Sequence, residues 1–219
     1  MGTHIHYKDS SIFSFQGPFR SAADIILASA SPRRQSLLTT LGISFQVIPA
    51  KLKEPDPEPK QKPEGYALHL ADAKASEVAD QKHSAVVIAA DTIVVLDQTI
   101  MGKPRSRANA LEMLKNLQDN THRVITAVSI LCRQKKVRES FFCETSVEMV
   151  SVEDHILRQY IDTGETDDKA GAYAIQGLGG FLIKSIQGSY TNVVGLPLAE
   201  VWTKLFQLHA ITLPEKDAP

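Results

Sequence analysis

Cysteine is scarce in this chain of 219 residues, which contains only Cys132 and Cys143. Two cysteines without metal-ligand spacing exclude a disulfide framework, so we interpret both as reduced thiols. No apolar run approaches the roughly 20 residues of a membrane-spanning helix, and no cleavable signal with an apolar centre is recognisable. An excess of charge is also missing, because 24 basic and 25 acidic residues give a net charge of −1. We therefore expect a cytoplasmic protein with neither a nucleic-acid nor a membrane partner.

Familiar nucleotide-binding and catalytic motifs are missing as well. The sequence has no Walker loop, no G-x-G-x-x-G fingerprint, no nucleophile elbow and no internal repeat. Its length allows one large α/β domain or two closely fused lobes. Residues 1–23 show no sustained hydrophobic period, so we treat them as an N-terminal extension with partial disorder and assign it no function. We expect residues 24–213 to form a single domain.

What the chain does contain begins with residues 27–34, LASASPRR. The apolar residues at the start predict a short strand, Ser31 is a favourable N-cap, and Pro32 suits the first position of a helix. The predicted helix therefore starts with free backbone N–H groups and the positive end of its dipole next to Arg33 and Arg34. Such a corner can hold a polyphosphate. The alternative is a capped helix with two solvated arginines.

A second informative stretch is the apolar, β-prone run over residues 85–96. A continuous run of this kind predicts a strand that is covered on both faces, as in the middle of an α/β sheet. Asp91 interrupts it, and a carboxylate there is costly unless it meets a cation, a metal ion or N–H donors, or lies above a crevice. The alternative is an aspartate that ends the strand and accepts hydrogen bonds from nearby backbone amides.

The remaining segments complete an α/β pattern. Residues rich in β-formers predict further strands over 45–48, 122–132, 137–150 and 181–186. Apolar residues at helical spacing predict helices over 64–79, 107–117 and 153–161, and a terminal helix through Val201, Leu205 and Leu208. Four prolines in residues 50–63 exclude a helix or a central strand, so we expect an exposed loop there.

Four polar side chains outside these two stretches are further candidates. Glu54 follows a predicted strand and can point back to the two arginines, although a solvated surface glutamate is the common alternative. Lys74 lies off the apolar stripe of its helix and Lys103 lies in a Gly-Lys-Pro turn, and each alone is an ordinary surface lysine. Gln176 lies in residues 166–190, whose dense glycines permit either close approach to a ligand or positive φ in a long loop.

Several short motifs follow one another along residues 25–208: LASASPRR, Glu54 after the second strand, LADAKA, AADT, GKP, THRVITAV, DKAGAYAIQG and GSYTNVVGLPL. In this order they resemble the Maf family of nucleotide pyrophosphatases. The resemblance implies hydrolysis of a nucleoside triphosphate to the monophosphate and pyrophosphate with a divalent cation. It also implies an α/β fold in which helices flank a mixed central sheet and two lobes enclose a nucleotide cleft. Residues 24–213 would then be a single Maf-like catalytic domain.

The resemblance also assigns roles to individual residues. Asp91 matches the catalytic aspartate of the family. Six other residues match substrate-binding positions: Arg33, Thr92 and Gln176, which are tied to base choice, and Glu54, Lys74 and Lys103. The segment DKAGAYAIQG resembles the branch that acts on dTTP and UTP, and differs from the branch that acts on 7-methyl-GTP. Lys53 and Ser146 stand where the family often has an acidic residue, which leaves the number of metal ions open.

These roles give a hypothesis for the reaction. Asp91 positions or deprotonates the attacking water and shares a Mg²⁺ or Mn²⁺ ion with Glu54, since such hard ions choose oxygen ligands. The positive charges of Arg33, Lys74 and Lys103 stabilise the phosphate groups.

Base choice and the neighbouring arginine complete the hypothesis. The amide of Gln176 offers a donor and an acceptor to the imide edge of thymine or uracil, and Thr92 completes that pocket. Arg34 either assists or is solvated. Two alternatives stay open at this point, namely a pyrophosphatase for another nucleotide such as 7-methyl-GTP and a nucleotide-binding regulator of cell division. The resemblance also makes a homodimer plausible.

Overall fold

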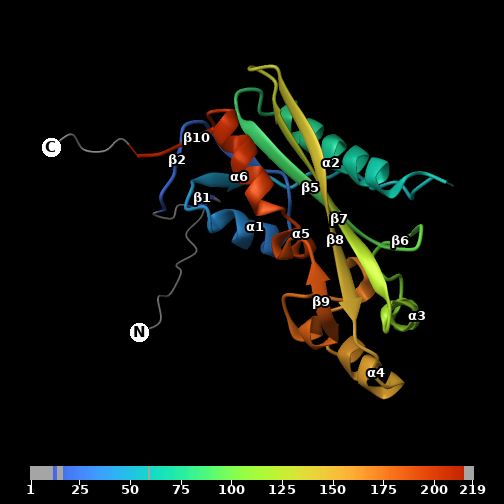
Figure 1. Cartoon of the computed structure of the whole chain (residues 1–219). Coiled ribbons are helices and arrows are strands. Elements are labelled where there is room, and N and C mark those ends of the chain that lie inside the picture. Colours follow the sequence, from blue (N-terminus) through green and yellow to red (C-terminus); the bar gives the residue numbers. More distant parts are fainter. Residues whose placement is uncertain (1–11, 14–16, 59, 215–219) are drawn as a thin grey trace.

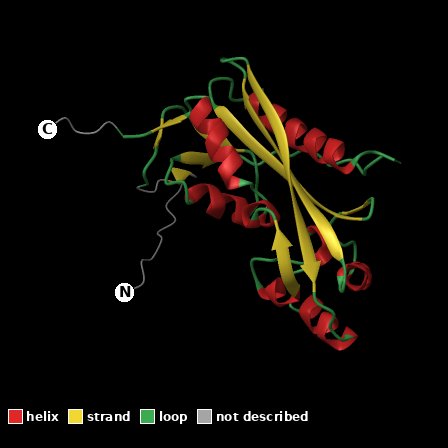
Figure 2. Ribbon diagram, viewed as in Figure 1, coloured by secondary structure: helices red, strands yellow, loops and turns green. Residues whose placement is uncertain are grey.

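The computed structural model describes residues 12–13, 17–58 and 60–214, and it has a mixed sheet with helices on both faces (Figure 1, Figure 2). The eight-stranded sheet has the order β1-β4-β3-β5-β7-β8-β9, with β6 paired to β5. Its strands are β1 (Ile12–Phe13), β3 (Ile25–Leu27), β4 (Phe45–Val47), β5 (Val86–Leu96), β6 (Thr99–Met101), β7 (Thr121–Cys132), β8 (Val137–Met149) and β9 (Ile183–Gln187). The strand β3 runs parallel to β4 and β5, and the other pairs are antiparallel. The predicted α/β fold with a mixed sheet is confirmed.

The helices cover the sheet in two places. They are α1 (Pro32–Thr39), α2 (Pro63–Ala79), α3 (Arg107–Leu117), α4 (Asp154–Asp162), α5 (Tyr190–Val194) and α6 (Leu198–Gln207). In the upper part of Figure 1, α2 packs on one face of β5 and β7 while α1 and α6 cover the other face. In the lower part, α3 and α4 pack around the far ends of the same long strands.

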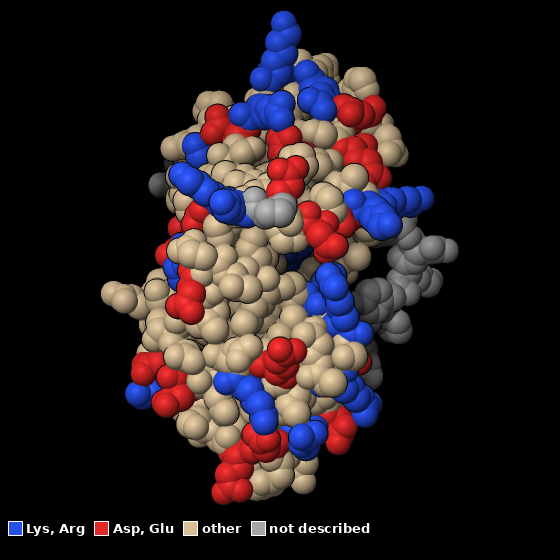
Figure 3. Space-filling view, turned by 90° about the vertical axis from the view of Figure 1, so that its right-hand side faces the viewer, with Lys and Arg blue, Asp and Glu red and all other residues tan. Residues whose placement is uncertain are grey.

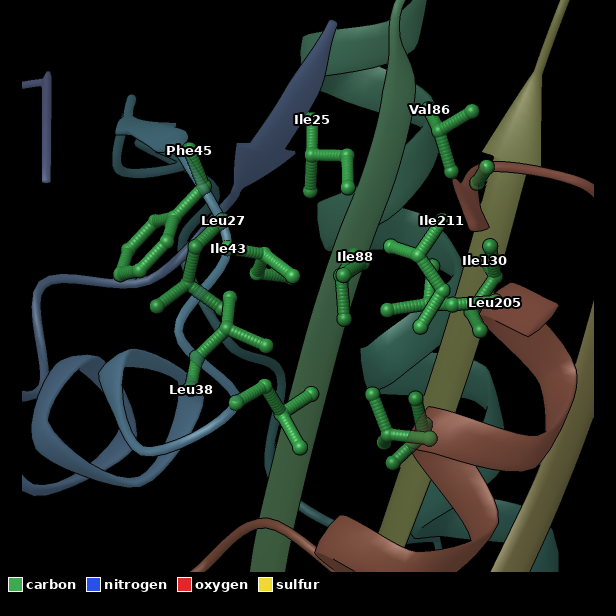
Figure 4. Packing of buried hydrophobic residues seen from close by; sticks show 14 of the residues in the cluster. Ile25, Leu27, Leu38, Ile43, Phe45, Val86, Ile88, Ile130, Leu205 and Ile211 are labelled. Atoms are coloured by element: carbon green, nitrogen blue, oxygen red, sulfur yellow. The ribbon is translucent and has the colours of Figure 1, made fainter. Parts of the chain in front are cut away.

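The long strands therefore join two hydrophobic cores. In the upper core, Ile88 of β5 and Ile130 of β7 pack against Leu205 of α6, as Figure 4 shows. In the lower core, Val94 of β5 packs with buried residues of α3 and α4, Leu114 among them. Because β5 and β7 contribute to both cores, the two parts of the molecule share one continuous sheet.

An interruption in the pairing of β5 makes room between the two parts. One edge of β5 is paired with β7 along nearly its whole length. On the other edge, β3 pairs with β5 only as far as Ile88, and β6 pairs with it from Val94 onward. The described strands leave the interval between them open, and Asp91 and Thr92 lie in it. Because successive side chains of a strand alternate, the two point to opposite faces of the sheet.

The structure differs from the sequence-based prediction mainly in short elements. Residues 17–23, counted with the extension, include a strand β2 (Arg20–Ser21) that pairs with β10 (Ile211–Thr212). Residues 178–182 form a 3-10 helix, so the strand predicted from residue 181 begins at residue 183. The helix α5, with five residues, and the strand β6, with three, were not predicted. Residues 1–11 and 14–16 lie outside the described residues, and so does that part of the predicted extension.

The two cysteines are free, as predicted. Cys132 pairs in register with Val137, and Cys143 with Thr126, so the two do not face each other across the hairpin. Among the described residues, no helix is both long and apolar enough to cross a membrane.

One buried side chain links the sheet to the lower part of the molecule. His122 of β7 is 1% exposed, and its Nε2 lies 2.7 Å from the hydroxyl oxygen of Tyr173. The two rings meet edge to face. Burial lowers the pKa of His122 to about 4, because the charged imidazolium is excluded from water.

The lowered pKa of His122 predicts a loss of stability in acid. His122 is protonated near pH 6.5 in the unfolded chain but only near pH 4 in the folded chain. The stability that comes from burying the neutral imidazole is therefore fully present at neutral pH and is lost as the pH falls from 6.5 to 4. At pH 4.5 the loss amounts to about 2 to 3 kcal/mol. Urea unfolding at pH 7 and pH 4.5 measures it: the difference in unfolding free energy between wild type and His122→Gln should shrink by about this amount. An unchanged difference would contradict the assignment.

Candidate active site

A cavity of about 1080 Å³ opens where the edge of β5 is unpaired. Figure 3 shows a hollow between the upper and lower parts of the molecule, with basic side chains beside it. Its volume lies just above the range of about 300–1,000 Å³ that is usual for small-molecule sites. The cavity brings together all seven residues that the sequence analysis singled out: Arg33, Glu54, Lys74, Asp91, Thr92, Lys103 and Gln176.

The centre of this cavity is an ammonium group shared by two carboxylates. Lys74 Nζ lies 2.6 Å from Asp91 Oδ1 and 2.6 Å from Glu54 Oε1. The side chain of Asp91 is 9% exposed and that of Lys74 is 13% exposed. The apolar stripe of α2 packs on the sheet, and Lys74 at the flank of this stripe reaches the open strand edge. A buried carboxylate is therefore paired with a cation, which is one of the arrangements the sequence required.

Glu54 reaches the same ammonium from the proline-rich loop. This loop passes over α2, where Tyr66 donates a hydrogen bond from its hydroxyl to the carbonyl of Pro55 at 2.8 Å. Burial alone would raise the pKa of Glu54, but the hydrogen bond and charge of Lys74, together with Lys103 and Arg34, lower it below its usual value. Glu54 is therefore ionised at neutral pH, and its carboxylate adds a second negative charge beside Asp91.

Both arginines of the helix entry line the cavity, and Arg34 is held in its wall by three hydrogen bonds. Its Nε donates to the carbonyl of Gly195 at 2.8 Å, and its guanidinium also donates to Thr92 Oγ1 at 2.9 Å and to Ser29 Oγ at 3.3 Å. Burial lowers the pKa of Arg34, and the carboxylate of Asp91 opposes this effect. The sequence left open whether Arg34 assists or is solvated, and the structure places it inside the cavity wall.

The hydroxyl of Thr92 is occupied by protein partners. Thr126 Oγ1 donates its proton to the carbonyl of Asn192 at 2.8 Å, so it can only accept from Thr92, whose oxygen lies 3.0 Å away. Thr92 thus donates to Thr126 and accepts from Arg34. This arrangement makes Thr92 an orienting partner of Arg34. Its predicted contact with the base stays a prediction.

The opposite wall of the cavity comes from the glycine-rich segment. Lys169, whose side chain is 12% exposed, pairs with Asp168. Burial would raise the pKa of Asp168, but the hydrogen bond and charge of Lys169 and, less strongly, the charge of Arg33 lower it below its usual value. Gln176 is exposed in this wall, and its amide has no hydrogen-bond partner among the described residues. The wall therefore combines positive charge with an unused donor and acceptor.

Sequence reasoning missed two of these features. Lys169 was not singled out, although it stands in the motif DKAGAYAIQG beside Asp168. The inward direction of Arg34 was not predictable, because two adjacent arginines at a helix start look alike in a sequence. The partner that fixes it, the carbonyl of Gly195, lies 161 residues away along the chain.

The residues present can be tested for a divalent cation. Among the described residues, no group of three or more histidine, cysteine, aspartate or glutamate side chains forms a metal site. Glu54 and Asp91 nevertheless meet on one ammonium group, so their oxygens lie close together. Magnesium is commonly bound through one or two carboxylates and the oxygens of a substrate's phosphates. The donor set therefore fits such an ion when phosphate oxygens complete it.

Comparisons with known proteins point in the same direction as this geometry. The sequence model of the family described as Maf-like protein matches residues 24–208. A dTTP/UTP pyrophosphatase of Nitratidesulfovibrio vulgaris is 45% identical over 200 residues, which cover 91% of this chain and 95% of the relative. Another of Desulfotalea psychrophila is 44% identical over 189 residues, which cover 86% of this chain and 96% of the relative. With a matching family model and relatives of this similarity over most of its length, the chain belongs to the Maf-like protein family.

Proposed function

We propose that the protein is a nucleoside triphosphate pyrophosphatase that hydrolyses dTTP and UTP to the monophosphate and pyrophosphate. The observation that carries this function is the cavity in which the paired carboxylate of Asp91, several cationic side chains and the free amide of Gln176 lie together. The curated relatives that bear this name are similar over most of both chains. A cytoplasmic location and a homodimer stay predictions of the sequence.

The charges of the cavity suit a triphosphate. Arg33, Arg34, Lys74 and Lys103 line it, while Lys74 is at the same time the cation that holds Asp91. In the proposed reaction, phosphate oxygens provide Lys74 with a new acceptor and so release the carboxylate of Asp91. The carboxylate then takes the proton of the attacking water. The water oxygen bonds to the α-phosphorus, and pyrophosphate leaves with the oxygen that bridged the α- and β-phosphates.

Glu54 and Asp91 are the residues that would hold a Mg²⁺ or Mn²⁺ ion. When bound, such an ion neutralises phosphate charge and makes a bound water more acidic. Arg34, fixed by Thr92 and the carbonyl of Gly195, presents its charge from the other side of the strand.

Base selection falls to the opposite wall. The amide of Gln176 can donate to a carbonyl oxygen and accept from the imide N–H of thymine or uracil. Cytosine has an amino group and an unprotonated ring nitrogen at these positions, which need the amide in the reversed orientation, so dTTP and UTP are favoured over CTP when the amide is held in the first orientation.

Replacing Asp91 with asparagine should lower kcat by at least about 100-fold, because the variant keeps the shape but loses the general base. Release of pyrophosphate from dTTP measures this. Asp97→Asn is a matched control, since Asp97 is an exposed residue in the turn after β5 with φ 56°, which asparagine tolerates well. A near-normal rate of Asp91→Asn would remove Asp91 from the mechanism.

A panel of nucleotides tests the substrate. We expect dTTP and UTP to have the highest kcat/KM among dTTP, UTP, CTP, dATP, GTP and 7-methyl-GTP, with monophosphate and pyrophosphate as the products. Product chromatography together with pyrophosphate release provides the readout. Faster hydrolysis of 7-methyl-GTP would assign the chain to another nucleotide, and no hydrolysis of any triphosphate would favour a role in binding alone.

A further inference from the structure

The loop that presents Gln176 is held from both sides by two side chains that do not line the cavity. Residues 173–177 form neither an α-helix nor a strand. Before Gln176, the backbone N–H of Ala174 donates to the hydroxyl oxygen of Tyr160 at 3.2 Å. After it, the N–H groups of Leu178 and Gly179 donate to the carboxylate of Glu165 at 2.9 and 2.8 Å.

The two holding residues are also bonded to each other. Tyr160 donates its hydroxyl proton to Glu165 Oε2 at 2.8 Å. Tyr160 lies in the last turn of α4 and is 3% exposed, and Glu165 follows the end of this helix after Gly164, whose φ is 78°. We call Tyr160 and Glu165 together the clamp. The clamp fixes the backbone on both sides of Gln176, whose own side chain is exposed and unpaired.

Gly177 and Gly179 lie where any larger residue would collide with the clamp. A Cβ atom on Gly177 would lie 2.1 Å from Glu165 Oε1, and one on Gly179 would lie 2.3 Å from the hydroxyl oxygen of Tyr160. Gly177 also has a φ of 154°, which side chains rarely adopt. The sequence left two explanations for these glycines, and in this loop they allow protein side chains to approach the backbone.

The protonation states keep the clamp closed at neutral pH. Burial would raise the pKa of Glu165, but the N–H groups of Gly179 and Leu178 and the hydroxyl of Tyr160 lower it below its usual value. Burial and the bond to Glu165 raise the pKa of Tyr160, so its hydroxyl stays a donor. Hydrogen bonds to an ionised carboxylate are stronger than those between neutral groups.

We propose that Tyr160 and Glu165 are positioning residues for base selection, which act by fixing the loop that presents the amide of Gln176 to the pyrimidine. This inference deepens the proposed function and rests on it. A donor and acceptor pair discriminates between bases only when it is held in place before the base arrives. The clamp comes from α4 and the turn that follows it, away from Lys74 and Asp91, so it acts on base recognition and leaves the chemical step unaffected.

Glu165→Gln tests the clamp with little change in shape. The amide puts an NH₂ group against a backbone N–H, so at least one charge-assisted hydrogen bond is lost. We expect KM for dTTP to rise about tenfold and the ratio of kcat/KM for dTTP over CTP to fall about tenfold, the scale of one such bond. The kcat for dTTP should stay within about twofold, because the lost interaction contributes to binding and not to the chemical step.

A matched control and a double substitution separate this role from a general effect on folding. Glu153, the N-cap residue of the same helix, has a side chain that is 82% exposed. Glu153→Gln should therefore change neither KM for dTTP nor the ratio of kcat/KM for dTTP over CTP. In a Gln176→Ala background, Glu165→Gln should no longer change the ratio of dTTP over CTP. Equal losses for both nucleotides, or a further drop of the ratio in that background, would overturn the proposal.

Tyr160→Phe keeps the proposal testable if Glu165→Gln does not fold. This substitution removes one hydroxyl group, and we expect a smaller fall in the ratio of kcat/KM for dTTP over CTP. In the Gln176→Ala background, it should not change this ratio. Measurements on the wild-type enzyme distinguish a failure of the proposed function from a failure of the clamp. If it does not prefer dTTP over CTP, the proposed function fails; if it does and both variants keep the preference, only the clamp is wrong.

Discussion

An ionised carboxylate on a strand buried between two layers of helices needs a cation, and Lys74 provides it for Asp91 at 2.6 Å. Removing one partner of a buried pair costs about 3–5 kcal/mol, because the other charge is left without compensation. The position of α2 on the sheet is tied to this contact, since the helix must bring its ammonium to the strand edge. The same ammonium draws Glu54 from the loop before α2. One interaction thus connects the layer packing, the loop and the site.

The long elements of the fold were predictable because each carries its own hydrophobic pattern. The strand β5 is apolar on both sides of Asp91 and Thr92 because helices cover both of its faces, and the hairpin of β7 and β8 is broken only by a polar turn. The short strands β2 and β10 were not predictable. Each has two residues and is a strand only through its pairing with the other, which lies about 190 residues away along the chain.

The site was predictable in part, and the limits have a physical reason. The sequence around Asp91 required a partner for the carboxylate, yet it could not name Lys74, because that contact depends on how α2 docks on the sheet. Only family resemblance brought the dispersed residues together. The direction of Arg34 and the occupied hydroxyl of Thr92 depend on hydrogen bonds to residues far along the chain. Such bonds leave no local pattern.

The open edge of β5 has a consequence for how the enzyme can change over time. The wall that carries Asp91, Lys74 and Glu54 comes from the first half of the chain, and the wall that carries Gln176 comes from the second half. Strands that run unbroken between them keep the walls at a fixed spacing. With the roles proposed above, a new preference for a nucleobase can arise by changes in the single surface loop of Gln176, while the residues proposed for hydrolysis stay unchanged.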